Sequence, residues 1–379
     1  MRTFIVHGLL ATTITLAGSA SLTPRSAAQV TPATPAAAQS IVLPRPTGVR
    51  PVGAATLPLV DHSRTDPWVP ASGARRLMVS LRYPARAAEG RPAPYMTPQE
   101  SALLLGGEGV TGVPPGVLSG TRTHAFAGAP PQRGRHPLVV LSPGFSLPRS
   151  SLTSLAEDLA SRGYVVAAID HTYESFGTTF PDGHTTTCVA CQEQTPELAR
   201  KVVRGRVADV SFVLDRLLGS RTWKGLVDPS RIGMAGHSIG GDSAAAAMGA
   251  DRRIRAGINM DGTINTPIAG LSRPFLLMGT VATHTPDSTV DASWQQEWPH
   301  LTGWKRWITV AGTQHSSFTD LHPIADQLGL DFGTDVSGAR AVQITRAYVG
   351  AFFDLHLRHR SEPLLDGPSR GYPEVSFWS

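Results

Sequence analysis

The sequence predicts a doubly wound α/β sheet that is mostly parallel and has helices on both faces. Short apolar runs rich in Val, Ile and Leu recur along the chain, and several lack the alternation of a half-buried strand. Parallel strands covered on both faces have this pattern. The predicted strands are Leu77–Tyr83, Pro137–Leu141, Tyr164–Ile169, Ile232–Ala235, Gly257–Met260, Phe275–Met278 and Trp307–Val310.

Helical segments lie between many of these runs, as strand–helix alternation requires. Most of them place apolar residues at helical spacing, and one is nearly all alanine, a strong helix former. The predicted helices are Ser151–Arg162, Pro196–Leu218, Ser243–Met248 and Ala339–Leu357. Active sites of such sheets gather at the carboxyl ends of the strands, so we expect the chemistry directly after the apolar runs.

The N-terminus resembles an export signal. Arg2 supplies a positive start, and Phe4–Ala17 is apolar but too short for a convincing membrane span. Small residues follow, with cleavage expected after Ala20 or Ala28. We therefore expect residues 1–28 to be a signal peptide and the mature protein to be secreted or periplasmic.

The rest of the chain predicts one large domain after a short leader. Residues 29–53 are rich in Pro, Ala and Thr and are expected to be flexible, whereas 54–379 are long enough for a single large core. Of the 379 residues, 41% are hydrophobic and 17% charged, an ordinary globular balance. The net charge of +5 is spread without a dense Lys/Arg run, which argues against a nucleic-acid partner.

The chain contains two cysteines, Cys188 and Cys191, in a CVAC arrangement. A redox motif would open a helix after a strand, but this pair follows a Thr-rich loop, and two thiolates are too few for a structural zinc site. In an exported protein a local disulfide is the expected state, with two free thiols as the alternative. The Gly/Pro-rich segment Met96–Gln132 is either a surface connection or a flap beside an acyl pocket.

The sequence GHSIGG at 236–241 lies between a predicted strand and the alanine-rich helix. A GxSxG pattern in this setting forms a tight, strained turn that presents the serine hydroxyl at the top of the sheet. Ser238 is therefore the predicted nucleophile, and a glycine turn with an unused serine is the alternative. The Ile239 N–H lies at the helix N-terminus, where negative charge is favoured, and is the first expected oxyanion-hole donor.

The second donor is expected in the turn SPGFS at 142–146, after an earlier strand. Gly144 allows close backbone approach, and Pro143 has no N–H to donate. The Phe145 N–H is therefore the candidate, with an ordinary strand-to-helix turn as the alternative.

The general base is expected in the loop after the last predicted strand, 307–310. His315 has this position and the chain order Ser, acid, His. His322 already enters the next element, and His284 and His300 precede the strand.

The acid has two candidate positions. Asp287 and Asp291 follow the predicted strand 275–278, which precedes the strand that leads to His315. Both lie well downstream of that strand, in a loop that we expect to be mobile. Asp261 directly ends the strand after the nucleophile strand, which makes its geometry more rigid. A structural aspartate in a turn with Gly262 is the alternative for Asp261.

Several motifs carry a family resemblance that covers roughly Trp68 to Phe353. They are LRYPA at 81–85, LSPGFS at 141–146, GYVVAAIDH at 163–171, GHSIGG at 236–241, NMDG at 259–262 and GTQHSSFTD at 312–320. In this set the chain resembles plasma-type platelet-activating-factor acetylhydrolase and its bacterial esterase relatives. The resemblance implies an α/β-hydrolase fold, an acid at Asp261, and donors at Phe145 and Ile239. Relatives often carry histidine at the position of Pro143, so a specificity for oxidised phospholipids does not follow from the resemblance.

The sequence thus predicts a secreted serine esterase that hydrolyses short-chain acyl or lipid esters through an acyl-enzyme, without a cofactor or metal. The expected partner is a small-molecule or lipid ester, with transient lipid-surface contact and no nucleic acid. A secreted polyester or cutin hydrolase, and a non-catalytic binding protein on the same scaffold, are the alternatives. Acyl length, head group and oligomeric state stay open.

Overall fold

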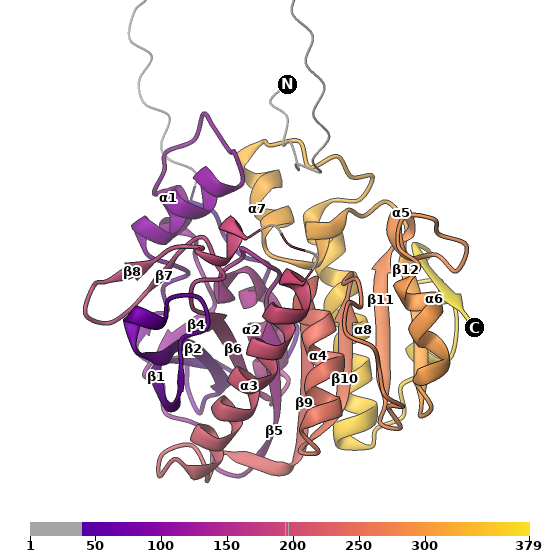
Figure 1. Ribbon diagram of the computed structural model, residues 1–379, viewed down its shortest axis with the longest axis horizontal. Helices are drawn as coiled ribbons and strands as arrows, with labels where there is room; N and C mark the ends of the chain where they lie inside the picture. The colour runs from indigo at the N-terminus through magenta and orange to yellow at the C-terminus, as the bar shows by residue number, and fades with distance from the viewer. Residues whose placement is uncertain (1–39, 194, 196) are drawn as a thin grey trace, which may run out of the picture.

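The computed structural model describes residues 40–193, 195 and 197–379. Within these residues eleven strands form one sheet, and two short strands form a separate hairpin (Figure 1). The order across the sheet is β13-β12-β11-β10-β9-β5-β6-β2-β1-β4-β3. The predicted signal peptide, residues 1–28, lies outside the described residues.

The centre of the sheet, from β12 to β6 in this order, is parallel. Its strands were all predicted, and most of their residues are buried, because helices cover both faces. Their bounds are β5 (His136–Ser142), β6 (Val165–His171), β9 (Val227–His237), β10 (Ile254–Met260), β11 (Phe275–Thr280) and β12 (Lys305–Val310). The carboxyl ends of β5, β9, β10 and β12 therefore meet at one edge of the sheet.

The outer strands were mostly not predicted. They are β1 (Val52–Thr65), β2 (Ala74–Pro84), β3 (Arg91–Pro92), β4 (Ala125–Ala127) and β13 (Val375–Trp378), and the hairpin is β7 (Thr178–Thr179) with β8 (Thr185–Thr186). Of these only β2 was expected; it pairs antiparallel with β1 and β6. Partly buried and exposed residues alternate along much of β1, so its apolar residues form no continuous run.

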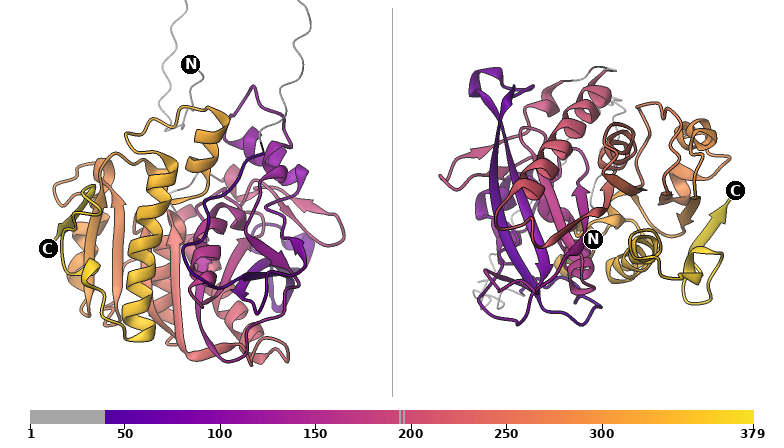
Figure 2. Two further views of the ribbon diagram at one scale, coloured as in Figure 1. Left: turned by 180° about the vertical axis from the view of Figure 1, so that it is seen from behind. Right: turned by 90° about the horizontal axis from the view of Figure 1, so that it is seen from below.

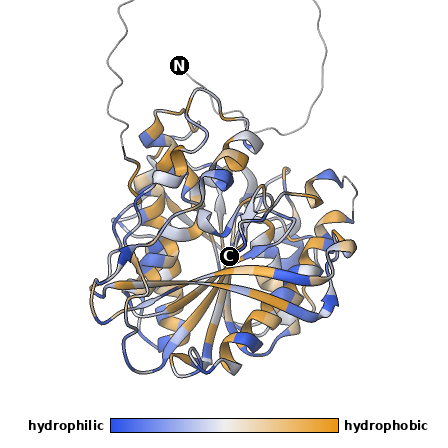
Figure 3. Cartoon of the chain, turned by 90° about the vertical axis from the view of Figure 1, so that its left-hand side faces the viewer, coloured by the Kyte–Doolittle hydropathy of each residue, from blue (hydrophilic) through white to orange (hydrophobic). Residues whose placement is uncertain are grey.

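Two helical layers enclose the sheet (Figure 2). Helices α3 and α4 pack on one face, and α2 and α8 pack on the other. All four were predicted from helical spacing or alanine content. The helices are α1 (Pro98–Gly107), α2 (Thr153–Ser161), α3 (Leu198–Gly219), α4 (Ile239–Ala250), α5 (Val281–His284), α6 (Ser293–Glu297), α7 (Leu321–Leu328) and α8 (Gly338–Arg358). Figure 3 shows hydrophobic residues along the strands between these layers. The doubly wound fold prediction is confirmed.

The leader predicted at 29–53 differs from the structure over its described part. Ile41 and Leu43 are buried, and Leu43 N–H donates to the carbonyl of Arg122. These side chains join an apolar cluster with residues of α1 and α7. Residues 40–53 are therefore part of the folded domain, because two apolar side chains and backbone pairing fix a segment whose composition suggested flexibility.

The described helices include none that is long and apolar enough to cross a membrane.

Candidate active site

The turn at residues 236–241, which contains the predicted nucleophile Ser238 and is called the nucleophile turn below, has the geometry that the GxSxG pattern predicts. Ser238 lies between β9 and α4 with φ at 56°, a strained value for a residue with a side chain. A Cβ on Gly236 would lie 2.0 Å from the carbonyl carbon of Gly240. A Cβ on Gly262 would lie 2.0 Å from the backbone carbonyl oxygen of Ser238. The turn is therefore too tight for any side chain at these glycines, and Ser238 itself stays partly exposed.

The two predicted oxyanion donors lie on either side of this turn. Ile239 begins α4, and Phe145 lies in the loop that follows β5, residues 143–148. Among the described residues neither N–H has a hydrogen-bond acceptor. A Cβ on Gly240 would lie 2.1 Å from the Ser142 oxygen, so the loop packs directly against the first turn of α4. Two unpaired backbone donors therefore lie on neighbouring segments.

The predicted acid and base are hydrogen-bonded to each other. Asp261 directly follows β10, is buried, and accepts a 2.7 Å hydrogen bond at Oδ2 from Nδ1 of His315. Its Oδ1 accepts from the Thr280 N–H at 2.6 Å. Burial opposes the ionisation of Asp261, but the hydrogen bond and charge of His315 outweigh it and hold the pKa of this carboxyl below its usual value. The carboxylate is thus fixed and ionised.

The His315 ring is exposed to solvent, and its backbone carbonyl is held by a neighbouring histidine. Its side chain is 48% exposed, as a base that must meet a substrate requires. The buried His237 donates from Nε2 to the His315 carbonyl at 2.9 Å, and the two ring centroids lie 4.6 Å apart. Burial lowers the pKa of His237 to about 3, so this neighbour stays neutral.

A further histidine, His284, lies close to the acid, although the sequence offered only its position before β12. It is buried, stacks on Trp294 and places Nε2 3.6 Å from Asp261 Oδ1. Its Nδ1 lies 3.7 Å from Asp291 Oδ2. Asp291 was expected in a mobile loop, but it is buried, and its side chain accepts a hydrogen bond from the Ser293 N–H. Asp287 is exposed, as expected. His315 bonds to Asp261 rather than to either of these.

The cysteine pair forms the predicted disulfide, Cys188–Cys191. Its loop belongs to an apolar cluster beside the nucleophile turn, which we call the apolar wall. The wall contains Trp68, Val69, Phe145, Tyr173, Cys188, Val189, Ala190, Leu198, Val202 and Ile239. The side chains of both donor residues thus pack with the disulfide loop.

The segment 96–132 contains α1 and β4, and part of it packs in an apolar cluster. Helix α1 begins with a capping box at Thr97, and Leu104 and Leu105 are buried against α7 and the N-terminal residues. Burial raises the pKa of Glu108, at the end of α1, and the nearby charge of His315 opposes this shift. Glu108 is therefore close enough to His315 for the two charges to interact.

A hydroxyl on a strained turn, a half-exposed imidazole, a buried carboxylate bonded to it and two free N–H groups are the components of a serine hydrolase. In the described part of the chain, no group of three or more His, Cys, Asp or Glu side chains could hold a metal ion.

Comparisons with known proteins agree with this chemistry. The family model described as platelet-activating factor acetylhydrolase, isoform II, matches residues 117–188 and 190–361. A probable 1-alkyl-2-acetylglycerophosphocholine esterase of Arthroderma benhamiae is 30% identical, over 89% of this chain and 94% of its own length. A cutinase of Thermobifida alba is 29% identical, over 40% of each chain.

The structure of a ferulic acid esterase from Streptomyces cinnamoneus superposes with a TM-score of 0.81. It is 46% identical and covers 90% of this chain and all of its own. The chain therefore belongs to the platelet-activating factor acetylhydrolase isoform II family and is a carboxylic ester hydrolase with an α/β-hydrolase fold.

Proposed function

We propose that this protein is an exported serine esterase in which Ser238, His315 and Asp261 form the catalytic triad. The observation that carries the proposal is the 2.7 Å hydrogen bond from His315 to a buried Asp261, one strand away from the strained Ser238 turn. A buried acid fixes the tautomer and orientation of the imidazole and stabilises the imidazolium that forms during the reaction.

In the proposed reaction, His315 accepts the Ser238 proton as the hydroxyl oxygen attacks the ester carbonyl. The tetrahedral oxyanion accepts hydrogen bonds from the Phe145 and Ile239 N–H groups. Collapse of this intermediate expels the alcohol, which takes the proton from His315, and leaves an acyl-enzyme. Water then repeats the sequence and releases the acid.

We further propose that the substrate places an apolar acyl or alcohol group against the apolar wall. Phe145, Tyr173 and Ile239 are only partly buried there and adjoin the nucleophile turn. Short-chain acyl esters, including lipid esters, are the favoured substrates, because the chain is 30% identical to a probable 1-alkyl-2-acetylglycerophosphocholine esterase. The aromatic content of the wall and the 46% identity to a ferulic acid esterase favour aryl esters as a second candidate.

Export is proposed from the N-terminal sequence. Residues 1–28 have a positive start, an apolar stretch and small residues at the expected cleavage positions. The disulfide supports an oxidising compartment, because disulfides persist mainly outside the cytosol.

The test is a substrate series with purified protein and Ser238→Ala as the blank. The series contains p-nitrophenyl esters of increasing acyl length, a 1-alkyl-2-acetylglycerophosphocholine, methyl ferulate and bis(hydroxyethyl) terephthalate. We expect the highest kcat/KM on acetyl to butyryl esters. Ser238→Ala should hydrolyse none of the substrates. Preference for methyl ferulate would replace the first substrate class by the second, and preference for the terephthalate ester would favour the polyester-hydrolase alternative.

A further inference from the structure

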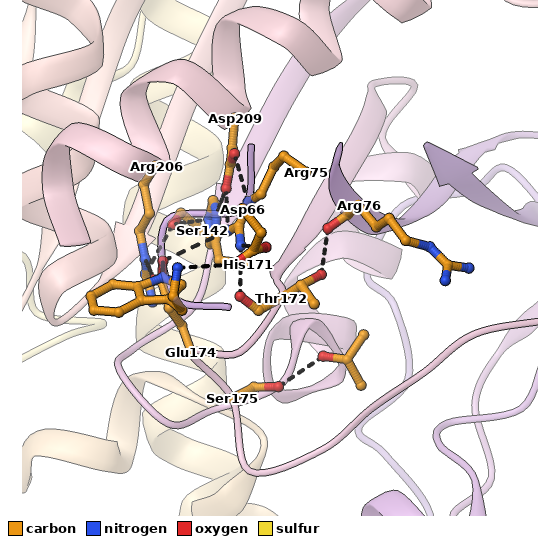
Figure 4. Close-up of polar contacts among 12 residues, drawn as sticks. Asp66, Arg75, Arg76, Ser142, His171, Thr172, Glu174, Ser175, Arg206 and Asp209 are labelled. Carbon is orange, nitrogen blue, oxygen red and sulfur yellow. Dashed lines mark hydrogen bonds and ion pairs between the residues drawn. The ribbon is translucent and has the colours of Figure 1, made fainter. Parts of the chain in front are cut away.

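The loop after β5, residues 143–148, and the last residue of that strand, Ser142, are held by a buried arginine on α3. Arg206 is 1% exposed and donates from Nη1 to the Pro143 carbonyl at 2.5 Å and to Ser142 Oγ at 3.2 Å. Its Nε donates to Glu174 Oε2 at 2.7 Å. Figure 4 shows this guanidinium between the carboxylate of Glu174 and the loop. A rigid fork of donors therefore connects α3 to the start of the loop.

The opposite side of the loop packs against the nucleophile turn. A Cβ on Gly240 would lie 2.1 Å from the Ser142 oxygen and 2.8 Å from the Pro143 oxygen. One on Gly144 would lie 2.8 Å from His237 Nδ1. The loop thus has Arg206 on one side and backbone of the nucleophile turn on the other.

Glu174 also holds the other end of the loop. Its carbonyl accepts from the Ser146 N–H at 2.9 Å, and Ser146 in turn accepts from the Phe176 N–H at 2.8 Å. Ser146 has a φ of 67°, a strained value that persists only where the surroundings enforce it. Phe145 therefore lies between two backbone anchors that both depend on residue 174.

The Arg206–Glu174 pair belongs to a larger buried network (Figure 4). Trp68 Nε1 donates to Glu174 Oε1 at 3.0 Å, and His171 bonds both Ser142 Oγ and Asp209. Arg75 is fully buried and pairs with Asp209 at 2.7 Å. Although burial opposes ionisation of Asp209, Arg75 and His171 hold its pKa far below its usual range. Buried ion pairs add little stability over apolar packing, and their best-attested use is to specify one geometry.

We propose that Arg206 is a positioning residue for the Phe145 oxyanion donor, and that Glu174 holds Arg206 in place. This inference rests on the proposed function. Gly144 separates Pro143 from Phe145 and has no side chain to restrict its φ and ψ. The Gly144 carbonyl, in the same peptide group as the Phe145 N–H, accepts from the Leu147 N–H at 3.3 Å. The direction of the Phe145 N–H therefore depends on this turn and on the anchors on either side, the Pro143 carbonyl and Ser146. Arg206 fixes the first anchor without touching the substrate.

The test measures transition-state and ground-state binding separately. An alkyl trifluoromethyl ketone forms a reversible hemiketal with the catalytic serine, and its oxyanion needs the same donors as the reaction. With Arg206→Met we expect kcat on p-nitrophenyl butyrate to fall about 10- to 100-fold and KM to stay within about threefold. The ketone KI should rise by the same factor as kcat/KM falls.

This readout separates positioning from a loss of folded enzyme. A smaller folded fraction lowers apparent kcat but leaves KI unchanged. Glu174→Gln is nearly isosteric and should show the same correlated change at about 3- to 10-fold, since a weaker Arg206 anchor remains. The matched control is Arg273→Met, which also removes a guanidinium bonded to backbone carbonyls, those of Met248, Asp251 and Ile254, but far from the loop. It should change kcat and KI less than about twofold.

A KI within about threefold of wild type in folded Arg206→Met would overturn the inference. If that variant does not fold, an unchanged KI in Glu174→Gln overturns it instead. Failure of the ketone to inhibit wild-type enzyme, or activity that survives in Ser238→Ala, would contradict the proposed function rather than the role of Arg206.

Discussion

The two sides of the proposed reaction centre are held in different ways. On one side, Asp261 directly follows β10, His315 lies in the loop after β12, and the two are fixed by one short hydrogen bond and neighbouring backbone. On the other, the loop that carries Phe145 depends on buried charges from α3 and from the segment after β6. Asp261, His315 and Phe145 each lie in a local sequence motif, whereas Arg206 and Glu174, which anchor the Phe145 loop, belong to no catalytic motif. The difference explains why these three residues could be predicted from motifs and the two anchors could not.

Loss of the nucleophile or the base removes the centre that both sides serve, so it has the largest expected effect. Ser238→Ala and His315→Ala should each lower turnover on the order of 10⁴- to 10⁶-fold while the fold is kept. Turnover on p-nitrophenyl butyrate and far-ultraviolet circular dichroism are the measurements. More than about a tenth of activity in Ser238→Ala would exclude it as the nucleophile.

Substitution of Asp261 tests the Asp261–His315 side alone. Asp261→Asn keeps the shape but favours the wrong tautomer of His315, so turnover should fall about 10³- to 10⁴-fold. Asp287→Asn is the matched control at an exposed aspartate and should cost less than about tenfold. Asp291→Asn should also stay below about tenfold, because Asp291 reaches the acid only through His284. A crippled Asp287 variant with an active Asp261 variant would move the acid to the loop after β11.

Each side also contains a buried, neutral histidine, His237 beside His315 and His171 beside the Phe145 loop. The folded state should therefore lose stability in acid. Burial lowers the pKa of His237 to about 3 and also lowers that of His171. The unfolded chain binds these protons below about pH 6.5, whereas the folded chain does not, so stability falls as pH falls from about 6.5 to 3. For His237 this amounts to about 3 kcal/mol between pH 6.5 and 4.

Urea unfolding at pH 7 and pH 4 measures the effect. His237→Gln should reduce the acid loss, because glutamine does not titrate, and the exposed His62→Gln should leave it unchanged. An acid loss of the same size in His237→Gln and wild type would contradict the account.

The disulfide should have the smallest effect. It closes a loop with a sequence separation of only 3, so its removal is expected to cost roughly 2 kcal/mol of unfolding free energy. The Cys188→Ser, Cys191→Ser double variant should keep kcat, with any change confined to KM, since the loop contributes to the apolar wall rather than to the triad. Loss of kcat without a change in KM would place the loop in the donor geometry instead.

The central strands and the triad candidates could be predicted because each depends on local sequence. Fully buried strands such as β6 form continuous apolar runs, and Ser238 sits in a pattern whose glycines the turn requires. The half-exposed β1 forms no such run. Residues 40–53 have a leader-like composition, yet Ile41 and Leu43 fix them to the domain. Composition therefore did not predict the structure of residues 40–53, because a few long-range contacts fix them to the domain.

The supporting residues could not be predicted for a related reason. His171 ends a motif that the sequence offered without a role, whereas Arg206 and Asp209 looked like ordinary members of an amphipathic helix. Their contacts with Ser142, Pro143 and Arg75 join segments more than 60 residues apart. Likewise, nothing near His284 indicated that it lies beside Asp261. Such networks become visible only after the sheet has brought the segments together.

The identity of the nucleophile is tested most directly by covalent labelling. Purified enzyme is treated with a fluorophosphonate, residual esterase activity is followed, and the modified residue is located by tandem mass spectrometry. We expect one phosphonyl group per chain, on Ser238, with activity lost in proportion to labelling and no labelling of Ser238→Ala. Inactivation with the label on another residue, or full activity after complete labelling of Ser238, would contradict this expectation.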